Sequence, residues 1–175
     1  MSSDDLLAFA DQFGTTSQPA PLPVERELHL VVFRLAGEQY AVPIGEVLEV
    51  VRVTDITRVP HAPAHIRGVM NLRGRILPVV EIRSRLHLDP AELTPLSRVV
   101  VVQVDRRVVG LLVDAVGQVT RVGEKMVSAP PDEVRAAGAE AVTGVARTST
   151  GLLVLLDLER VLRTSRIDTS APTAP

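Results

Sequence analysis

The second half of the chain repeats the pattern of the first half. Residues 32–53 match residues 101–122 as strand, charged turn, strand, break and strand. Residues 66–86 match residues 142–162 in the same order. Three pairs mark this second match: Gly68 with Gly144, Gly74 with Gly151, and Arg83 with Arg160. A repeat at this spacing predicts two similar structural units of about 70 residues each.

Short apolar runs separated by turns predict strands rather than long helices. About ten runs fit the strand pattern: residues 28–35, 40–44, 47–53, 69–72, 76–82, 99–104, 108–113, 116–122, 142–147 and 152–156. Three short helices are expected at residues 82–88, at 132–137 before Gly138, and at 157–163 behind Asp157 as N-cap. We therefore expect an all-β protein built as two similar small barrels, each with five strands and a closing short helix.

The core is expected to consist of valine and leucine, because aromatic residues make up only 2% of the chain. The same scarcity removes the stacking platforms that single-stranded nucleic acid binders use. The net charge of −2 gives no overall field that would attract nucleic acid or an anionic membrane.

The folded domain is expected at residues 26–163. Residues 1–25 form an extension whose segment 15–23 is a Pro/Ser/Thr-rich linker. Ahead of that linker, Leu6, Phe9, Ala10 and Phe13 have helical spacing, which fits either a short docking helix or a frayed tail. Residues 164–175 are expected to be a disordered tail. The amino terminus lacks a basic leader and a continuous apolar stretch, so we expect a cytoplasmic protein without membrane insertion.

The sequence contains no catalytic or cofactor motif. Phosphate loops, dinucleotide-binding glycine motifs and nucleophile elbows are absent, and the chain has no cysteine. His61 and His65 have a spacing that could bind metal on a helix, but Pro60 and Pro63 prevent a regular helix there. We therefore expect no metal, no cofactor and no enzymatic activity.

Five arginines are concentrated in one stretch: Arg67, Arg73, Arg75, Arg83 and Arg85. Nucleic acid binding is disfavoured by the missing aromatics and by the acidic Glu81 within the stretch. A solvated basic face is one interpretation. The other is that Arg73, at a tight turn, binds acidic or backbone oxygens of a protein partner.

Four segments together resemble the CheW family of bacterial chemotaxis coupling proteins: residues 33–51, 66–86, 108–119 and 151–162. The resemblance runs over residues 28–162 and is most specific at residues 68–83, which read GVMNLRGRILPVVEIR. The sequence DAV at residues 114–116 supports it. The resemblance implies a fold of two SH3-like five-stranded barrels.

The resemblance also implies a function and a set of contact residues. The family is a non-enzymatic scaffold that joins the cytoplasmic tips of methyl-accepting chemoreceptors to the regulatory domain of a CheA-type histidine kinase in membrane-associated arrays. Arg73 and Glu49 match positions where the family exposes polar residues important for assembly. Val47, Gly110 and Val119 match positions near the groove for the receptor tip helices. An adaptor of a related pathway controlling surface motility, pili or gene expression fits the same residues.

The missing motifs generate a first prediction. Purified protein should neither hydrolyse nucleotide nor require metal, so ATP and divalent metal ions should leave its thermal midpoint unchanged in a thermal shift assay. A stabilisation by metal that disappears in His61→Ala or His65→Ala would contradict the prediction.

Overall fold

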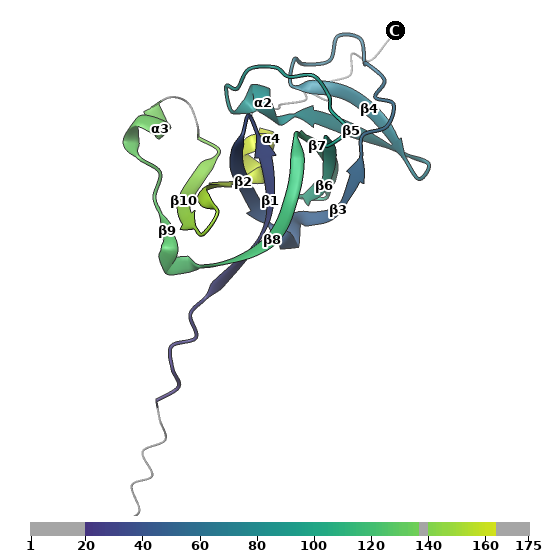
Figure 1. The fold of residues 1–175 in the computed structure, drawn as a ribbon. Coiled ribbons are helices and arrows are strands. Elements are labelled where there is room, and N and C mark those ends of the chain that lie inside the picture. Colours follow the sequence, from purple (N-terminus) through teal and green to yellow (C-terminus); the bar gives the residue numbers. More distant parts are fainter. Residues whose placement is uncertain (1–19, 137–139, 164–175) are drawn as a thin grey trace, which may run out of the picture.

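Strands dominate the regular secondary structure of the protein, as expected from its short apolar runs (Figure 1). The computed structural model describes residues 20–136 and 140–163. The strands are β1 (Glu27–Leu35), β2 (Glu38–Pro43), β3 (Val47–Arg52), β4 (Ile66–Leu72), β5 (Arg75–Glu81), β6 (Arg98–Val104), β7 (Arg107–Val113), β8 (Ala115–Gly123), β9 (Val127–Ser128), β10 (Val142–Thr148) and β11 (Gly151–Leu156). Short helices are η1 (Ile44–Glu46), α2 (Ile82–Arg85), η2 (Glu124–Met126), α3 (Asp132–Ala136) and α4 (Leu158–Arg163).

The expected all-β class with a few short helices is confirmed within these residues. All ten expected strands are present, and only the two-residue β9 was not foreseen. The expected N-cap is also present, because the Asp157 carboxylate accepts a hydrogen bond from the backbone N–H of Arg160 at 3.0 Å. The helix expected around residues 6–13, the Gly138 cap and the tail from residue 164 lie outside the described residues.

The strands form two mixed sheets, which we call sheet A and sheet B. Sheet A has the order β8-β1-β2-β11-β10-β9, and sheet B has the order β3-β6-β7-β5-β4. In each sheet one parallel pair joins antiparallel hairpins: β2 with β11 in sheet A, and β5 with β7 in sheet B. Figure 1 shows sheet B on the right, with β9 and β10 of sheet A on the left.

The two halves of the chain exchange their first hairpins. The β1–β2 hairpin of the first half lies in sheet A beside strands of the second half, and the β6–β7 hairpin of the second half lies in sheet B. The expectation that each half forms its own unit is therefore wrong, because each sheet combines strands of both halves. Local patterns predict strands but not their partners, which are set by long-range packing.

Neither sheet closes through a continuous ladder of hydrogen bonds, but the chain connects the edges of both. In sheet A, the three residues of η2 join the edge strands β8 and β9. In sheet B, Thr57 beyond the end of β3 exchanges two backbone hydrogen bonds with Val69 of β4, at 2.8 and 2.9 Å. Each sheet is thus curled, so that its two edges approach one another.

The backbone register confirms the repeat and corrects two of the expected residue pairings. The bulges at Gly68 and Gly144 occupy the same place in their hairpins. The hairpin turns lie between Leu72 and Arg75 and between Thr148 and Gly151, so Gly74 corresponds to Thr150 rather than to Gly151. For the same reason Arg83 corresponds to Glu159, because α2 and α4 begin at corresponding positions. The expected pairings of Gly74 and Arg83 were wrong by one residue.

Three apolar clusters form the core. One lies within each sheet, around Leu153 in sheet A and around Val79 in sheet B. The largest joins the two sheets and α4, with Phe33, Val100 and Leu158 among its members, and we call it the central core. Burial and the neighbouring Glu38 carboxylate raise the pKa of Tyr40, one of its members, to about 12.

No helix in the described part of the chain is long and apolar enough to cross a membrane.

A buried ion pair ties the exchanged hairpins together. The Arg83 guanidinium of α2 pairs with Asp114, between β7 and β8, and donates to the carbonyl oxygen of Asp89 at 2.8 Å. Asp114 also accepts a hydrogen bond from the backbone N–H of Ala36, in the β1–β2 turn, at 2.9 Å. The Arg83 side chain is only 9% exposed, so the Asp114 carboxylate is needed to compensate its buried positive charge.

Asp114→Ala should therefore lower the free energy of unfolding. Removing one partner of a fully buried pair costs about 3–5 kcal/mol, and we expect about 2–3 kcal/mol because the Asp114 side chain is 36% exposed. The exposed Glu92 forms no ion pair within the described residues, so Glu92→Ala is the control, with an expected change below about 0.5 kcal/mol. Equal losses for both variants in urea unfolding would contradict this role of Asp114.

Candidate functional site

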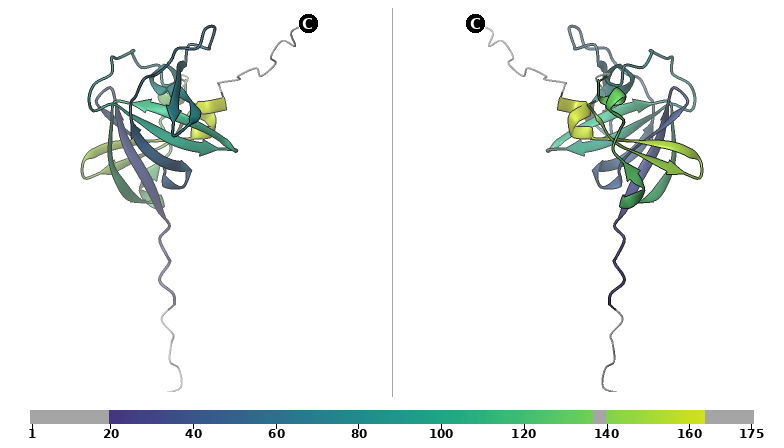
Figure 2. Two further views of the ribbon diagram at one scale, coloured as in Figure 1. Left: turned by 90° about the vertical axis from the view of Figure 1, so that its right-hand side faces the viewer. Right: turned by 90° about the vertical axis from the view of Figure 1, so that its left-hand side faces the viewer.

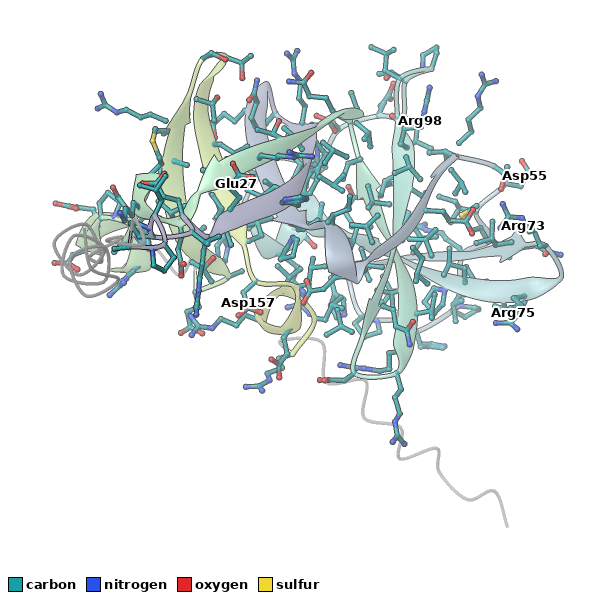
Figure 3. The ribbon with its side chains drawn as sticks, turned by 90° about the horizontal axis from the view of Figure 1, so that it is seen from below. Glu27, Asp55, Arg73, Arg75, Arg98 and Asp157 are labelled. Atoms are coloured by element: carbon teal, nitrogen blue, oxygen red, sulfur yellow. The ribbon has the colours of Figure 1, made fainter. Side chains whose placement is uncertain are left out.

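The β4–β5 hairpin ends in a tight turn that projects Arg73. Arg73 and Gly74 both have positive φ angles, 49° and 82°, as the two central residues of a type I′ turn require. The backbone N–H of Gly74 donates to Asn71 Oδ1 at 2.8 Å, which fixes the turn. Arg73 is thus held at the tip of the hairpin, where Figure 3 shows it with Arg75 at the end of the molecule far from Glu27.

Arg73 forms a forked ion pair with Glu49 of β3. Its two terminal nitrogens each donate to one Glu49 carboxylate oxygen at 2.8 Å. The two residues come from opposite edges of sheet B, which the curl of the sheet brings together. An exposed pair contributes roughly 0–1 kcal/mol to stability, so its main effect is to orient the guanidinium.

An apolar groove of about 360 Å³ adjoins this ion pair. Leu48 of β3, Ile76 of β5 and Val108 of β7 line it, and all three are exposed, Ile76 to 69%. Leu72, Leu77, Arg75 and Val101 complete the lining. We call this surface, including Arg73 and Glu49, the sheet B groove. Exposed aliphatic side chains beside an oriented arginine are typical of a protein-binding surface.

Sheet A has a related groove with different chemistry. It measures about 460 Å³ and is lined by corresponding strands, including Gln118 of β8 and Thr148 of β10. Gln118 occupies the position of Glu49, and Ser149 occupies that of Arg73, so no ion pair forms there. Thr150 instead donates to Gln39 at 3.2 Å. The repeat thus yields two grooves, of which only one carries exposed aliphatic side chains beside an ion pair.

Val47 and Val119 lie on the two edge strands that border the central core. Val47 of β3 is opposite Val102, and Val119 of β8 is opposite Val31. Val102 and Val31 both belong to the central core, so Val47 and Val119 face the same layer from different sheets. Val47 is half-buried, whereas Val119 is 54% exposed. We call the positions of Val47 and Val119 on these two edge strands the apolar border, and neither residue lines the sheet B groove.

Gly110 lies inside sheet B. It is buried on β7, and a Cβ atom at this position would lie 2.4 Å from Val99 Cγ1 and 3.1 Å from Leu77 Cδ2. The glycine is needed for the close approach of these side chains. Gly110 is therefore not part of the contact surface that we propose below.

Three of the five concentrated arginines are held in ion pairs. Arg67 pairs with Glu81 at 3.3 Å, Arg73 pairs with Glu49, and Arg83 pairs with Asp114. Acidic groups gather beside Val47 instead, where burial raises the pKa of Glu46 and the nearby Asp157 and Glu159 raise it further. Within the described residues, no three acidic, histidine or cysteine side chains are placed to hold a metal ion.

The sequence did not identify Leu48, Ile76 and Val108 as site residues. Each belongs to a strand that is apolar on both faces, a pattern that fits a strand buried on both sides. The small size of the protein could have indicated them. A sheet at the end of a small protein has no second layer of structure over its outer face, so apolar residues on that face stay exposed.

Comparisons with known proteins agree with this architecture. The family model described as CheW-like domain matches residues 29–166. The chain is 32% identical to chemotaxis protein CheW of Treponema pallidum over 82% of this chain and 86% of that protein. It is 37% identical to chemotaxis protein CheW of Rhizobium meliloti over 75% and 85% of the two chains.

A solved structure has the same fold. The crystal structure of the scaffolding protein TtCheW from Thermoanaerobacter tengcongensis superposes with a TM-score of 0.71 at 33% sequence identity. The match covers 78% of this chain and 93% of that one. The expected all-β fold of the CheW family is thereby confirmed. The two expected five-stranded barrels differ in detail, because neither sheet closes and sheet A has six strands.

The packing around Gly110 generates a prediction. Gly110→Ala should lower the free energy of unfolding by about 1–3 kcal/mol, because the added methyl group overpacks the interior of sheet B. Gly45 has open space around its Cβ position and a negative φ angle, so Gly45→Ala is the matched control. A Gly110→Ala protein as stable as Gly45→Ala in urea unfolding would show that Gly110 is not needed for packing.

Proposed function

The chain belongs to the CheW-like domain family, and from this premise we propose that it joins methyl-accepting chemoreceptors to a CheA-type histidine kinase through protein contacts alone. Its function is that of a chemotaxis adaptor scaffold. The observation that carries the proposal is the sheet B groove, where exposed aliphatic side chains adjoin an arginine held by a forked ion pair.

We assign the sheet B groove to the regulatory domain of the kinase. Leu48, Ile76 and Val108 supply apolar area that binding would remove from water. Arg73 needs little reordering on binding because Glu49 already orients its guanidinium. Since Glu49 leaves other N–H groups of Arg73 available, a partner oxygen can be bound beside the pair.

We assign the border of Val47 and Val119 to the receptor tip helices. Its residues are aliphatic and only partly covered, and they lie over the central core rather than in either groove. An amphipathic helix recognises such a strip through side chains spaced by three and four residues. Because this border and the sheet B groove are separate, both partners can be bound at once.

A scaffold of this kind needs no catalytic step, and it acts by fixing the distance between its partners. The corresponding location is the cytoplasmic side of the membrane, at the receptor arrays.

Arg73→Glu should weaken binding of the kinase regulatory domain at least about tenfold while the thermal midpoint stays close to that of wild type. The substitution places two carboxylates together beside the groove. Arg106 is exposed at the tip of the β6–β7 hairpin with φ 72° and forms no ion pair within the described residues, so Arg106→Glu is the matched control. Titration calorimetry and co-sedimentation with receptor and kinase measure the loss of binding, and a circular dichroism melt measures the thermal midpoint.

The pair can be tested further by exchanging its charges. Glu49→Arg alone should also weaken kinase binding, and the double variant Arg73→Glu, Glu49→Arg should keep a thermal midpoint close to that of wild type without recovering full affinity. Unchanged affinity in Arg73→Glu would overturn the assignment of the groove. If Arg73→Glu unfolds the protein, the arginine is structural and the assignment is also wrong.

A further inference from the structure

Two arginines lie directly opposite each other at the end of β3. In the antiparallel pairing of β3 with β6, Val50 is opposite Val100 and Arg52 is opposite Arg98. Side chains at opposite positions point to the same face with Cβ atoms about 4.5–5.5 Å apart, and like charges there are unfavourable. Neither arginine forms an ion pair with a described residue. Arg98, shown in Figure 3, is fixed by donating to the carbonyl oxygens of Pro95 and Ser97 at 2.8 Å each.

Sheet A repeats this arrangement at the corresponding positions. In the pairing of β8 with β1, Val119 is opposite Val31 and Arg121 is opposite His29. Arg121 and His29 are both exposed, and neither has an ion-pair partner among the residues that the structure describes. A basic pair thus follows an apolar pair on both edge strands, although the two halves differ in most of their residues.

Both basic pairs adjoin the border that we assign to the receptor. Val100 and Val31 belong to the central core, so the residues opposite them, Val50 and Val119, face that core. They remain 40% and 54% exposed, because β3 and β8 are edge strands. Arg52 and Arg121 follow two residues later on the same face. On each edge strand, the exposed valine is therefore followed by two basic groups that form no ion pair with a described residue.

We propose that the Arg52–Arg98 pair is a carboxylate-binding site, with Arg121–His29 as its counterpart, for acidic side chains on the receptor helices. This inference rests on the proposed function. Val50 and Arg52 are about 6.6 Å apart along a strand, and one turn of an α-helix rises about 5.4 Å. The recognised helix should accordingly carry an acidic residue three or four positions from an apolar one. A carboxylate placed between the two guanidinium groups would replace their repulsion with two attractive contacts.

The proposal predicts opposite effects of one substitution on stability and on binding. Arg52→Glu places opposite charges across the strands, so the thermal midpoint should rise by about 1–4 °C. The affinity for a purified cytoplasmic fragment of a methyl-accepting chemoreceptor should fall at least about tenfold. Wild-type binding should weaken with added salt, and this dependence should become smaller in Arg52→Glu. The control Arg106→Glu should change neither the affinity nor its salt dependence.

A charge exchange identifies the partner residue. Each acidic residue of the receptor tip is changed to lysine in turn, and one of these variants should bind Arg52→Glu more tightly than it binds wild type. If wild type binds the fragment and Arg52→Glu binds equally well, the carboxylate site is wrong while the proposed function stands. If wild type does not bind the fragment, the receptor assignment and this inference both fail. Weakened binding that no lysine variant restores would also contradict a specific carboxylate site.

Discussion

The exchange of hairpins between the two halves of the chain is the constraint on which the rest of the structure depends. Sheet A needs β1 and β2 from the first half, and sheet B needs β6 and β7 from the second. Each exchanged hairpin contributes one face to the central core and the other face to the core of its own sheet. The two sheets are therefore held by shared strands as well as by packing. The Arg83–Asp114 pair fixes the point where the exchanged segments meet, as the position of α2 beside β7 in Figure 1 illustrates.

This exchange also positions the surfaces that the protein presents. Because each hairpin is surrounded by other strands, β3 and β8 are left as edge strands with aliphatic side chains facing a partly covered core. The curl of sheet B brings β4 toward the end of β3, which joins Arg73 to Glu49 across the groove. The two views of Figure 2 show α4, in yellow, at the surface of the molecule. A receptor surface and a kinase surface thus arise from one arrangement of strands.

The sequence predicted the strands well, because their apolar runs and turn residues are local signals. It also predicted that Arg73 would lie at an exposed turn. The type I′ turn found there holds Arg73 at a positive φ angle, which residues other than glycine adopt less often. The pairing of Arg73 with Glu49 and the exchange of hairpins depend on long-range contacts that no local pattern encodes. Gly110 illustrates the same limit, since a glycine in a strand fits either a binding position or a close packing contact, and the neighbouring Val99 and Leu77 distinguish the two.

The central claim is that receptor and kinase occupy separate surfaces of one scaffold. It is tested most directly by titrating the kinase regulatory domain into the protein in the presence and absence of a saturating receptor fragment. Separate surfaces predict the same dissociation constant in both titrations and a ternary complex of the three proteins in gel filtration. Displacement of the receptor fragment by the kinase domain, with no ternary complex at any concentration, would contradict the account.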